Sequence, residues 1–176
     1  DGVKLAAHED IDDAGQTVYY PDIRTSARDS ETAEGVSAAD DKVTITDTVS
    51  YSGLMPGKEY KVTGTLMDKT TGKPVETDGN KVTSEAVFTA DKTTGTADVT
   101  FEFGGKDLAG KTTVVFETLE YRNREIAVHA DLTSDSQTVY FPEIGTMASD
   151  SETGTGVSRA DDEVTVIDKV MYQNLR

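Results

Sequence analysis

The sequence has no cysteine and no tryptophan, and basic residues are about half as common as acidic ones. Without cysteine, the chain can form neither a disulfide nor a thiolate metal site, and it has no thiol nucleophile. The 17 basic and 33 acidic residues give a net charge of −16, which repels nucleic-acid phosphates and anionic lipid surfaces. No apolar run approaches the roughly 20 residues of a membrane-spanning helix. We therefore expect neither a nucleic-acid partner nor a membrane partner for this segment.

A long internal repeat dominates the sequence. HEDIDDAGQTVYYPDI, which begins at His8, recurs as HADLTSDSQTVYFPEI at His129. TSARDSETAEGVSAADDKVTITDTVSYSGL recurs in the same way as TMASDSETGTGVSRADDEVTVIDKVMYQNL. The offset is constant at 121 residues, as between Gln16 and Gln137. A period of this length corresponds to a whole domain rather than to a solenoid unit.

The repeat predicts three parts in the chain. Residues 1–21 are expected to be the last strand of a preceding repeat, 22–142 one complete repeat, and 143–176 the first strands of a following repeat. Because the first residue is Asp rather than Met, we expect the chain to be a piece of a longer tandem array. The strands of the two partial repeats are expected to lack their partners.

The complete repeat has the pattern of an antiparallel β-sandwich. Short alternating runs rich in Thr and Val are separated by Gly, Pro, Asn and Asp, and no stretch holds a helical period over three turns. About eight strands in about 120 residues predict an all-β, immunoglobulin-like sandwich. The expected strands are 23–27, 43–51, 58–68, 81–90, 94–103, 112–121, 124–130 and 137–141.

Four polar side chains fall where strand alternation predicts a buried face. Successive side chains of a strand point to opposite faces, so Asp47 shares a face with the Val and Ile residues of VTITDTVSY. By the same parity, Glu117 in VVFETL, Thr25 in IRTSA and Gln137 in QTVYF lie on apolar faces. An unpartnered buried polar group costs about 1–3 kcal/mol. We therefore expect the four side chains to contact one another.

Such a cluster can support one acyl transfer. Two carboxyl groups in an apolar site cannot both ionise cheaply, so Asp47 and Glu117 are expected to share a proton. The pair would donate a hydrogen bond to the Gln137 carbonyl and stabilise the oxyanion that forms when the Thr25 hydroxyl attacks. His129 would take the hydroxyl proton and pass one to the leaving ammonia. The expected product is a Thr25–Gln137 ester, formed once per molecule without turnover.

Each candidate residue has a simpler interpretation on its own. A strand Thr is common, a strand carboxylate faces solvent if the register shifts by one residue, and a lone His usually lies at the surface. The repeat strengthens the set, because four of the five candidates have a counterpart of the same type, while Glu117 lies outside the duplicated stretch. We expect the counterparts to remain unreacted, since neither partial repeat is complete. The pairs are Thr25 and Thr146, Asp47 and Asp168, His129 and His8, and Gln137 and Gln16.

Five short motifs surround these residues. VVFETL at 114–119 contains V-x-F-E, HADLTSDSQTV at 129–139 contains H-x-D-x5-Q-T, and residues 43–75 contain D-x-V-x-Y, L-x-P-G-x-x-Y and G-x-L-x-D segments. Together they resemble the Thr-Gln ester bond domains, or VaFE repeats, found in tandem in the stalks of Gram-positive surface adhesins. The resemblance implies a CnaB-like sandwich with Thr25 as nucleophile and Gln137 as acyl donor. It also implies His129 as general base and Asp47 with Glu117 as the acid pair.

The resemblance further implies a role for the whole chain. The module would belong to an extracellular protein anchored in the cell wall, with neighbouring repeats as its partners and no cofactor or metal. The ester would join the first strand of the module to the last, so that tension bypasses the hydrogen-bonded core.

Four other readings compete with this one. The first is a sandwich spacer without a cross-link, and the second is a Lys–Asn or Lys–Asp isopeptide domain, which is disfavoured because the opening strand has no Lys at core parity. The third is a calcium-dependent adhesion module, although its Asp-rich loop becomes DLTSDS in the second copy. A turnover enzyme is disfavoured because the candidate groups are expected inside a sandwich. The residues that suggest calcium are Asp10, Asp12, Asp13 and Gly15.

Overall fold

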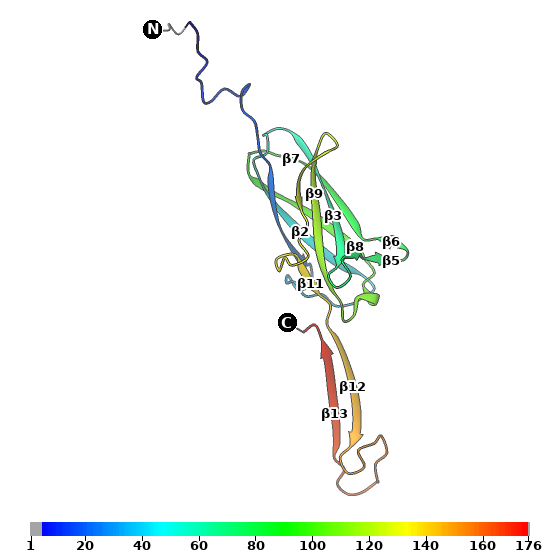
Figure 1. Cartoon of the computed structure of the whole chain (residues 1–176). Helices are drawn as coiled ribbons and strands as arrows, with labels where there is room; N and C mark the ends of the chain where they lie inside the picture. The colour runs from blue at the N-terminus through cyan, green and yellow to red at the C-terminus, as the bar shows by residue number, and fades with distance from the viewer. Residues whose placement is uncertain (1–4, 176) are drawn as a thin grey trace.

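The computed structural model describes residues 5–175. Along one axis it contains an extended N-terminal segment, a β-sandwich and a separate β-hairpin (Figure 1). The chain enters the sandwich at one end and leaves it at the other, so the two connections lie at opposite ends of its long axis (Figure 1). Within the described residues, no helix is long and apolar enough to cross a membrane.

The all-β prediction is confirmed, and the ends of the eight expected strands agree with the structure within two residues. Residues 5–175 contain no α-helix, and the helical element is the short 3-10 turn η1 (Lys106–Leu108). The main strands of the sandwich are β1 (Asp22–Asp29), β2 (Val43–Ser52), β3 (Glu59–Asp68), β7 (Thr83–Thr89), β8 (Gly95–Phe103), β9 (Thr112–Tyr121), β10 (Arg124–His129) and β11 (Thr138–Tyr140). The short strands β4 (Lys73–Pro74), β5 (Glu76–Thr77) and β6 (Asn80–Lys81) lie between β3 and β7.

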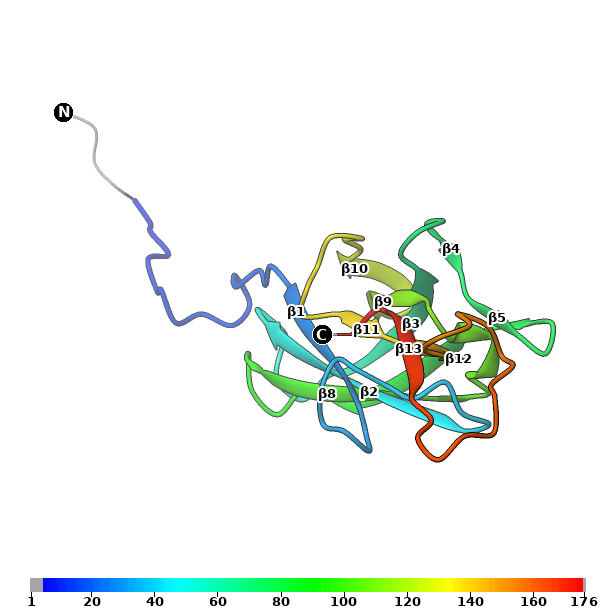
Figure 2. The same ribbon diagram turned by 90° about the horizontal axis from the view of Figure 1, so that it is seen from below.

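Two antiparallel sheets make up the sandwich. One has the order β1-β2-β8, and the other has the path β10-β9-β3-β4, with β11 paired to β9 and β7 paired to β3. Viewed along the long axis, β2 and β8 lie on one side and β3, β9 and β10 on the other (Figure 2). The first strand, β1, is therefore at the edge of one sheet, while β10 and β11 pair with the same strand of the other sheet.

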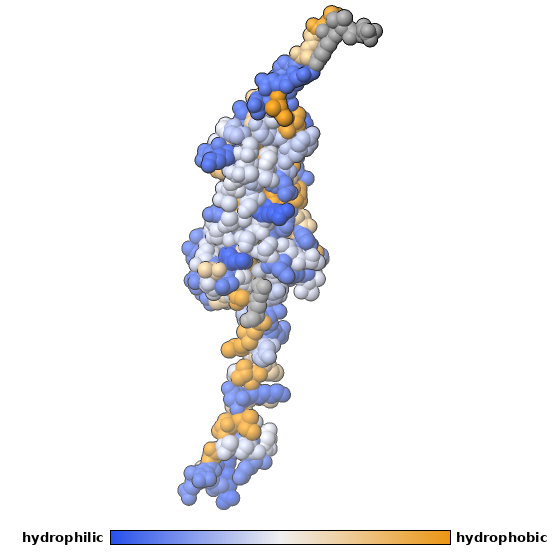
Figure 3. All heavy atoms as spheres, turned by 90° about the vertical axis from the view of Figure 1, so that its left-hand side faces the viewer, coloured by the Kyte–Doolittle hydropathy of each residue, from blue (hydrophilic) through white to orange (hydrophobic). Residues whose placement is uncertain are grey.

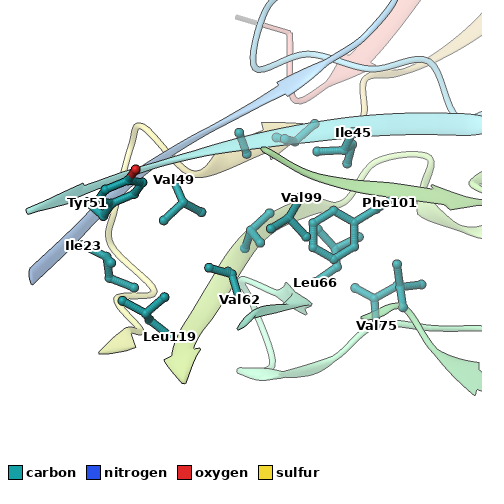
Figure 4. Packing of buried hydrophobic residues seen from close by; sticks show 14 of the residues in the cluster. Ile23, Ile45, Val49, Tyr51, Val62, Leu66, Val75, Val99, Phe101 and Leu119 are labelled. Atoms are coloured by element: carbon teal, nitrogen blue, oxygen red, sulfur yellow. The ribbon is translucent and has the colours of Figure 1, made fainter. Parts of the chain in front are cut away.

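Alternating residues of both sheets form the core. In Figure 4, Ile45 and Phe101 of the smaller sheet lie near Leu66 of the larger sheet, and all three side chains are at most 1% exposed. Gly64 makes room for this packing, because a Cβ there would lie 2.5 Å from the Phe101 ring. A glycine on β3 thus allows a large aromatic side chain to fill the centre of the sandwich.

The hairpin of β12 (Glu143–Asp150) and β13 (Val166–Gln173) repeats the geometry of β1 and β2. Thr146 lies opposite Val170, just as Thr25 lies opposite Val49. The sequence predicts strands without partners here, but β12 and β13 pair with each other, because the β1–β2 contact lies wholly within the duplicated sequence.

Nothing covers the apolar side chains of the hairpin in the described structure. Ile144 is 66% exposed and Tyr172 is 65% exposed, and apolar patches lie along the hairpin surface (Figure 3). Within the described residues, the hairpin is therefore a two-stranded sheet without an opposing sheet.

The N-terminal segment differs from the sequence-based expectation. Residues 5–21 contain turns but no strand, whereas a last strand of a preceding repeat was predicted there. In the complete repeat the equivalent strand, β11, pairs with β9. Because residues 5–21 have no counterpart of β9 to pair with, the β pattern in their sequence does not produce a strand. Residues 1–4 of the predicted segment lie outside the described residues.

Candidate functional site

The five residues singled out in the complete repeat meet between the two sheets. Thr25 on β1, Asp47 on β2, Glu117 on β9 and Gln137 just before β11 are between 0% and 6% exposed. His129 at the end of β10 has a side chain that is 25% exposed, so it lies between this buried cluster and solvent. Four separate strands and the segment before β11 thus contribute to one site.

Strand register explains how these side chains meet. In the β1–β2 pair, Ala27 lies opposite Asp47, which places Thr25 two residues along the same face. In the β10–β9 pair, His129 lies directly opposite Glu117. The backbone oxygen of Gln137 accepts a hydrogen bond from Val115 N at 3.2 Å, which brings Gln137 next to β9.

The Thr25 hydroxyl has two polar neighbours. Its Oγ1 donates to Glu117 Oε2 at 3.1 Å and lies 3.4 Å from His129 Nδ1. Both are groups that can accept a hydroxyl proton. The nearby hydroxyls of Ser26, Thr44 and Thr46 belong to the opposite parity of β1 and β2, so register selects Thr25 for the site.

The Gln137 amide bridges the site with its two ends. Nε2 donates to Glu117 Oε1 at 2.9 Å and to Asp47 Oδ1 at 3.3 Å, while Oε1 lies 3.0 Å from His129 Nδ1. This differs from the expectation that the acid pair would face the amide oxygen. The amide nitrogen has protons for carboxyl oxygens to accept, so it faces the carboxyl groups and leaves the oxygen to the imidazole.

The site raises the pKa of both carboxyl groups. Burial, together with the neighbouring Asp47 carboxyl, raises the pKa of Glu117 to about 11. Burial also raises the pKa of Asp47. Among the described protein atoms, the buried Asp47 Oδ2 has no hydrogen-bond partner while both carboxyl groups are ionised. A proton shared with Glu117 supplies that partner, because a buried carboxyl pair is more stable with one proton than with two negative charges.

Sequence reasoning missed residues that hold the segment before β11. Ser136 bonds to β1 twice: its Oγ donates to Thr25 O at 3.0 Å, and its backbone O accepts from Ala27 N at 3.0 Å. Lys69 Nζ donates to Thr138 Oγ1 at 2.9 Å. The repeat gave no signal for Ser136, since the equivalent position is occupied by Gly15. Thr138 had a signal, because it is the Thr of the Q-T motif.

Asp131, the acidic residue of the H-x-D motif, lies outside the cluster. Its Oδ1 accepts hydrogen bonds from Thr133 Oγ1 at 2.7 Å and from Thr133 N at 2.8 Å. These bonds lower the pKa of Asp131. Its position is that of a residue that shapes the turn between His129 and Gln137.

The counterpart residues of the partial repeats do not assemble a site. Thr146 and Asp168 are exposed on the hairpin, and His8 Nε2 contacts Asp13 Oδ2 at 3.0 Å at the other end of the molecule (Figure 1). Gln16 is exposed in the same N-terminal segment as His8. Each partial repeat thus holds two of the residue types that the complete repeat brings together.

In the Asp-rich loop considered for calcium, side-chain oxygens accept hydrogen bonds from the backbone of the same loop. Asp10 Oδ1 accepts from Asp12 N, and Asp13 Oδ1 accepts from Gly15 N. Over residues 5–175, no group of three or more acidic, His or Cys side chains is arranged to hold a metal ion.

Fold and site together define an immunoglobulin-like sandwich module with a buried Thr–Gln pair between its first and last strands. The chain belongs to the family of T-Q ester bond containing domains, whose model matches residues 21–141 and again residues 142–176. The family resemblance inferred from the motifs is thereby confirmed.

Solved structures with a similar fold include a bacterial adhesin from Mobiluncus mulieris containing intramolecular disulfide, isopeptide, and ester bond cross-links. In space group P21 it gives a TM-score of 0.58 at 15% identity, over 87% of this chain and 75% of that chain. In space group P1 the TM-score is 0.57 at 13% identity, over 87% of this chain and 76% of that chain. No curated protein matches the sequence.

Proposed function

We propose that residues 22–142 form an intramolecular ester between Thr25 and Gln137 and act as a load-bearing stalk module of a bacterial surface adhesin. One observation carries the proposal: Thr25 Oγ1 and Gln137 Oε1 both contact His129 Nδ1, at 3.4 Å and 3.0 Å. Family membership and the fold of the Mobiluncus adhesin support the same reading.

In the proposed reaction, Thr25 Oγ attacks the side-chain carbonyl carbon of Gln137. Negative charge develops on Gln137 Oε1, where His129 Nδ1 stabilises it by donating a hydrogen bond. The carbon–nitrogen bond then breaks, and Nε2 leaves as ammonia. Hydroxyl and carboxamide are converted into ester and ammonia, so no co-reactant is needed.

Glu117 is the natural carrier of the transferred proton. Its Oε2 lies 3.1 Å from the Thr25 hydroxyl and its Oε1 lies 2.9 Å from the Gln137 nitrogen. A protonated carboxyl group can accept a proton at one oxygen and donate a proton from the other. Glu117 therefore serves as proton relay, and Asp47 keeps it protonated. In an alternative assignment, His129 Nδ1 carries no proton and accepts the hydroxyl proton across 3.4 Å, and it then donates no hydrogen bond to Gln137 Oε1 until it has been protonated.

The position of the bond suits a load-bearing module. Thr25 is on the strand that enters the sandwich and Gln137 directly precedes the strand that leaves it. A pull applied through the two ends would pass through the ester and leave residues 26–136 without tension. By analogy with a disulfide, closing a loop of about 110 residues stabilises by up to about 4–5 kcal/mol.

Neighbouring modules of the same kind are the proposed partners, because the family model matches the chain a second time at residues 142–176. An extracellular, cell-wall anchored parent protein is part of the proposal, and family membership and the fold shared with the Mobiluncus adhesin support it.

The mass of the intact purified chain tests the proposal. An ester lowers the mass by about 17 Da, the mass of the ammonia that is lost on acyl transfer. Peptide mapping should then find the peptides of Thr25 and Gln137 joined. The variant Thr25→Val should keep the full mass, while Ser26→Ala, which removes a hydroxyl from the next position of β1, should lose ammonia like the parent. A folded parent chain of full mass would contradict the proposal.

A further inference from the structure

The residue before Gln137 is hydrogen-bonded to the strand that carries Thr25. Strand β1 is an edge strand, and its pairing partner is β2. Ser136 approaches from the opposite side of β1: its backbone oxygen accepts from Ala27 N, and its hydroxyl donates to Thr25 O, each across 3.0 Å. One residue thus bonds to β1 on both sides of Ser26.

This pattern is that of a parallel ladder in which a side chain replaces a backbone group. A residue in a parallel ladder accepts from one backbone N–H of the neighbouring strand and donates its own N–H to the carbonyl two residues earlier. At Ser136 the acceptor is the backbone oxygen, but the donor to Thr25 O is the side-chain hydroxyl. The second hydrogen bond therefore depends on the identity of the side chain.

The two hydrogen bonds join the backbones of the two reacting residues. Thr25 supplies one acceptor itself, and Gln137 follows Ser136 directly in the chain. Lys69 Nζ, from outside segment 131–138, donates to Thr138 Oγ1, and within the segment Thr138 Oγ1 donates to Ser134 O at 2.6 Å. Movement of β1 away from Ser136 would separate nucleophile and acyl donor. Effective reaction between held groups requires near-contact geometry.

We propose that Ser136 is a positioning residue for the cross-link, whose hydroxyl holds β1 at the distance from Gln137 at which Thr25 reacts. The inference rests on the proposed Thr25–Gln137 ester. Ser136 is exposed, so its replacement by Ala removes the hydrogen bond to Thr25 O, and a contact with Ser134 Oγ at 3.2 Å within the same turn, without leaving a cavity in the core. Loss of a neutral hydrogen bond corresponds to a rate reduced by about 3–10-fold.

The test follows ammonia loss in newly made chains. Parent, Ser136→Ala, Ser136→Thr and Ser26→Ala chains are synthesised in a cell-free system, sampled over time into acidic urea and weighed by mass spectrometry. We expect Ser136→Ala to react about 3–10-fold more slowly. Ser136→Thr, which keeps the hydroxyl, should return to within about twofold of the parent, and Ser26→Ala should match it. The pH profile of the rate should keep its shape, since Ser136 touches no group that transfers a proton.

A separate measurement distinguishes a local effect of Ser136 on β1 from an effect on the stability of the whole fold. In the Thr25→Val background, which cannot form the ester, Ser136→Ala should speed hydrogen exchange at Ala27 N while leaving β9 amides unchanged. Equal rates for Ser136→Ala and Ser26→Ala, or equal slowing by Ser136→Ala and Ser136→Thr, would overturn the inference. A parent chain that never loses ammonia would instead overturn the proposed ester, whatever the exchange data show.

Discussion

Gln137 donates a hydrogen bond from Nε2 to Oε1 of Glu117 across 2.9 Å, so the nitrogen that leaves in the proposed reaction faces a buried carboxyl group. The other oxygen of the same carboxyl group is 3.1 Å from Thr25 Oγ1. Glu117 thus contacts both the group that loses a proton and the group that gains one. Because burial keeps its pKa high, this carboxyl group is protonated at neutral pH and can transfer a proton.

Replacing Glu117 by Gln is expected to stop the cross-link while keeping the fold. Gln has the shape of Glu and hydrogen-bonding atoms at the same positions, but its amide cannot relay a proton from Thr25 to the leaving nitrogen. General acid–base catalysis contributes about 100- to 10,000-fold, so ammonia loss should slow by at least about 100-fold. Intact mass over time measures the rate, and circular dichroism verifies the fold.

A matched control lies on the same strand. Glu120 points away from the site and contacts Lys61 Nζ at 2.9 Å, so Glu120→Gln should react at the parent rate. If Glu117→Gln loses ammonia as quickly as Glu120→Gln, the relay assigned to Glu117 is wrong.

Removing the nucleophile should destabilise the module through its unfolded state. Thr25→Val keeps the shape of the side chain but leaves the loop between positions 25 and 137 open when the chain unfolds. A loss of about 4–5 kcal/mol lowers the melting temperature of a domain of this size by roughly 15–20 °C. Thr25→Ser, which keeps a hydroxyl, should lose ammonia and melt near the parent. Melting of Thr25→Val within a few degrees of the parent would show that no stabilising bond is formed.

Strand positions and buried parity were readable from the sequence because both follow from local alternation. The run VTITDTVSY placed Asp47 among buried residues, and the structure has it fully buried between Ile45 and Val49. The same argument located Thr25, since β1 is buried at every second position. The alternation of side chains along each strand therefore located most residues of the site.

Contacts that depend on tertiary approach were not readable in this way. Ser136 lies in a turn, and its contact with Thr25 spans 111 positions of sequence. The orientation of the Gln137 amide depends on whether the carboxyl groups lie next to its nitrogen or its oxygen, and no sequence pattern predicts which. The N-terminal segment was predicted as a strand because alternation marks the tendency to pair, whereas pairing itself needs a neighbour.

The chain without the ester should lose stability as pH rises. Burial lifts the pKa of Glu117 from 4.5 to about 11 in the folded state, so between these values the folded chain binds more protons than the unfolded chain. The free energy of unfolding of Thr25→Val should then be highest near the acidic end of this range and fall by up to about 1.4 kcal/mol per pH unit. Urea unfolding between pH 5 and pH 9 measures the slope.

A double variant isolates the contribution of Glu117 to this slope. The double variant Thr25→Val with Glu117→Gln lacks the carboxyl group whose pKa is raised. The free energy of unfolding should therefore depend less steeply on pH. The lowered pKa values of Asp131 and Asp150 affect stability only as pH falls toward their folded values, below this window. A flat profile for Thr25→Val would mean that the carboxyl group of Glu117 is ionised in the folded module.

The whole chain should lose one ammonia and not two. Thr146 and Asp168 have the same register on the hairpin as Thr25 and Asp47 in the sandwich, but they are exposed and have no counterpart of Glu117. Without a buried carboxyl pair, nothing there relays a proton. The parent mass should therefore fall by about 17 Da only, and Thr146→Val should leave this deficit unchanged. Peptide mapping should recover the peptides of Gln16 and Thr146 unmodified. A deficit of about 34 Da, or a peptide joining Gln16 to Thr146, would show that the partial repeats react without the acid pair.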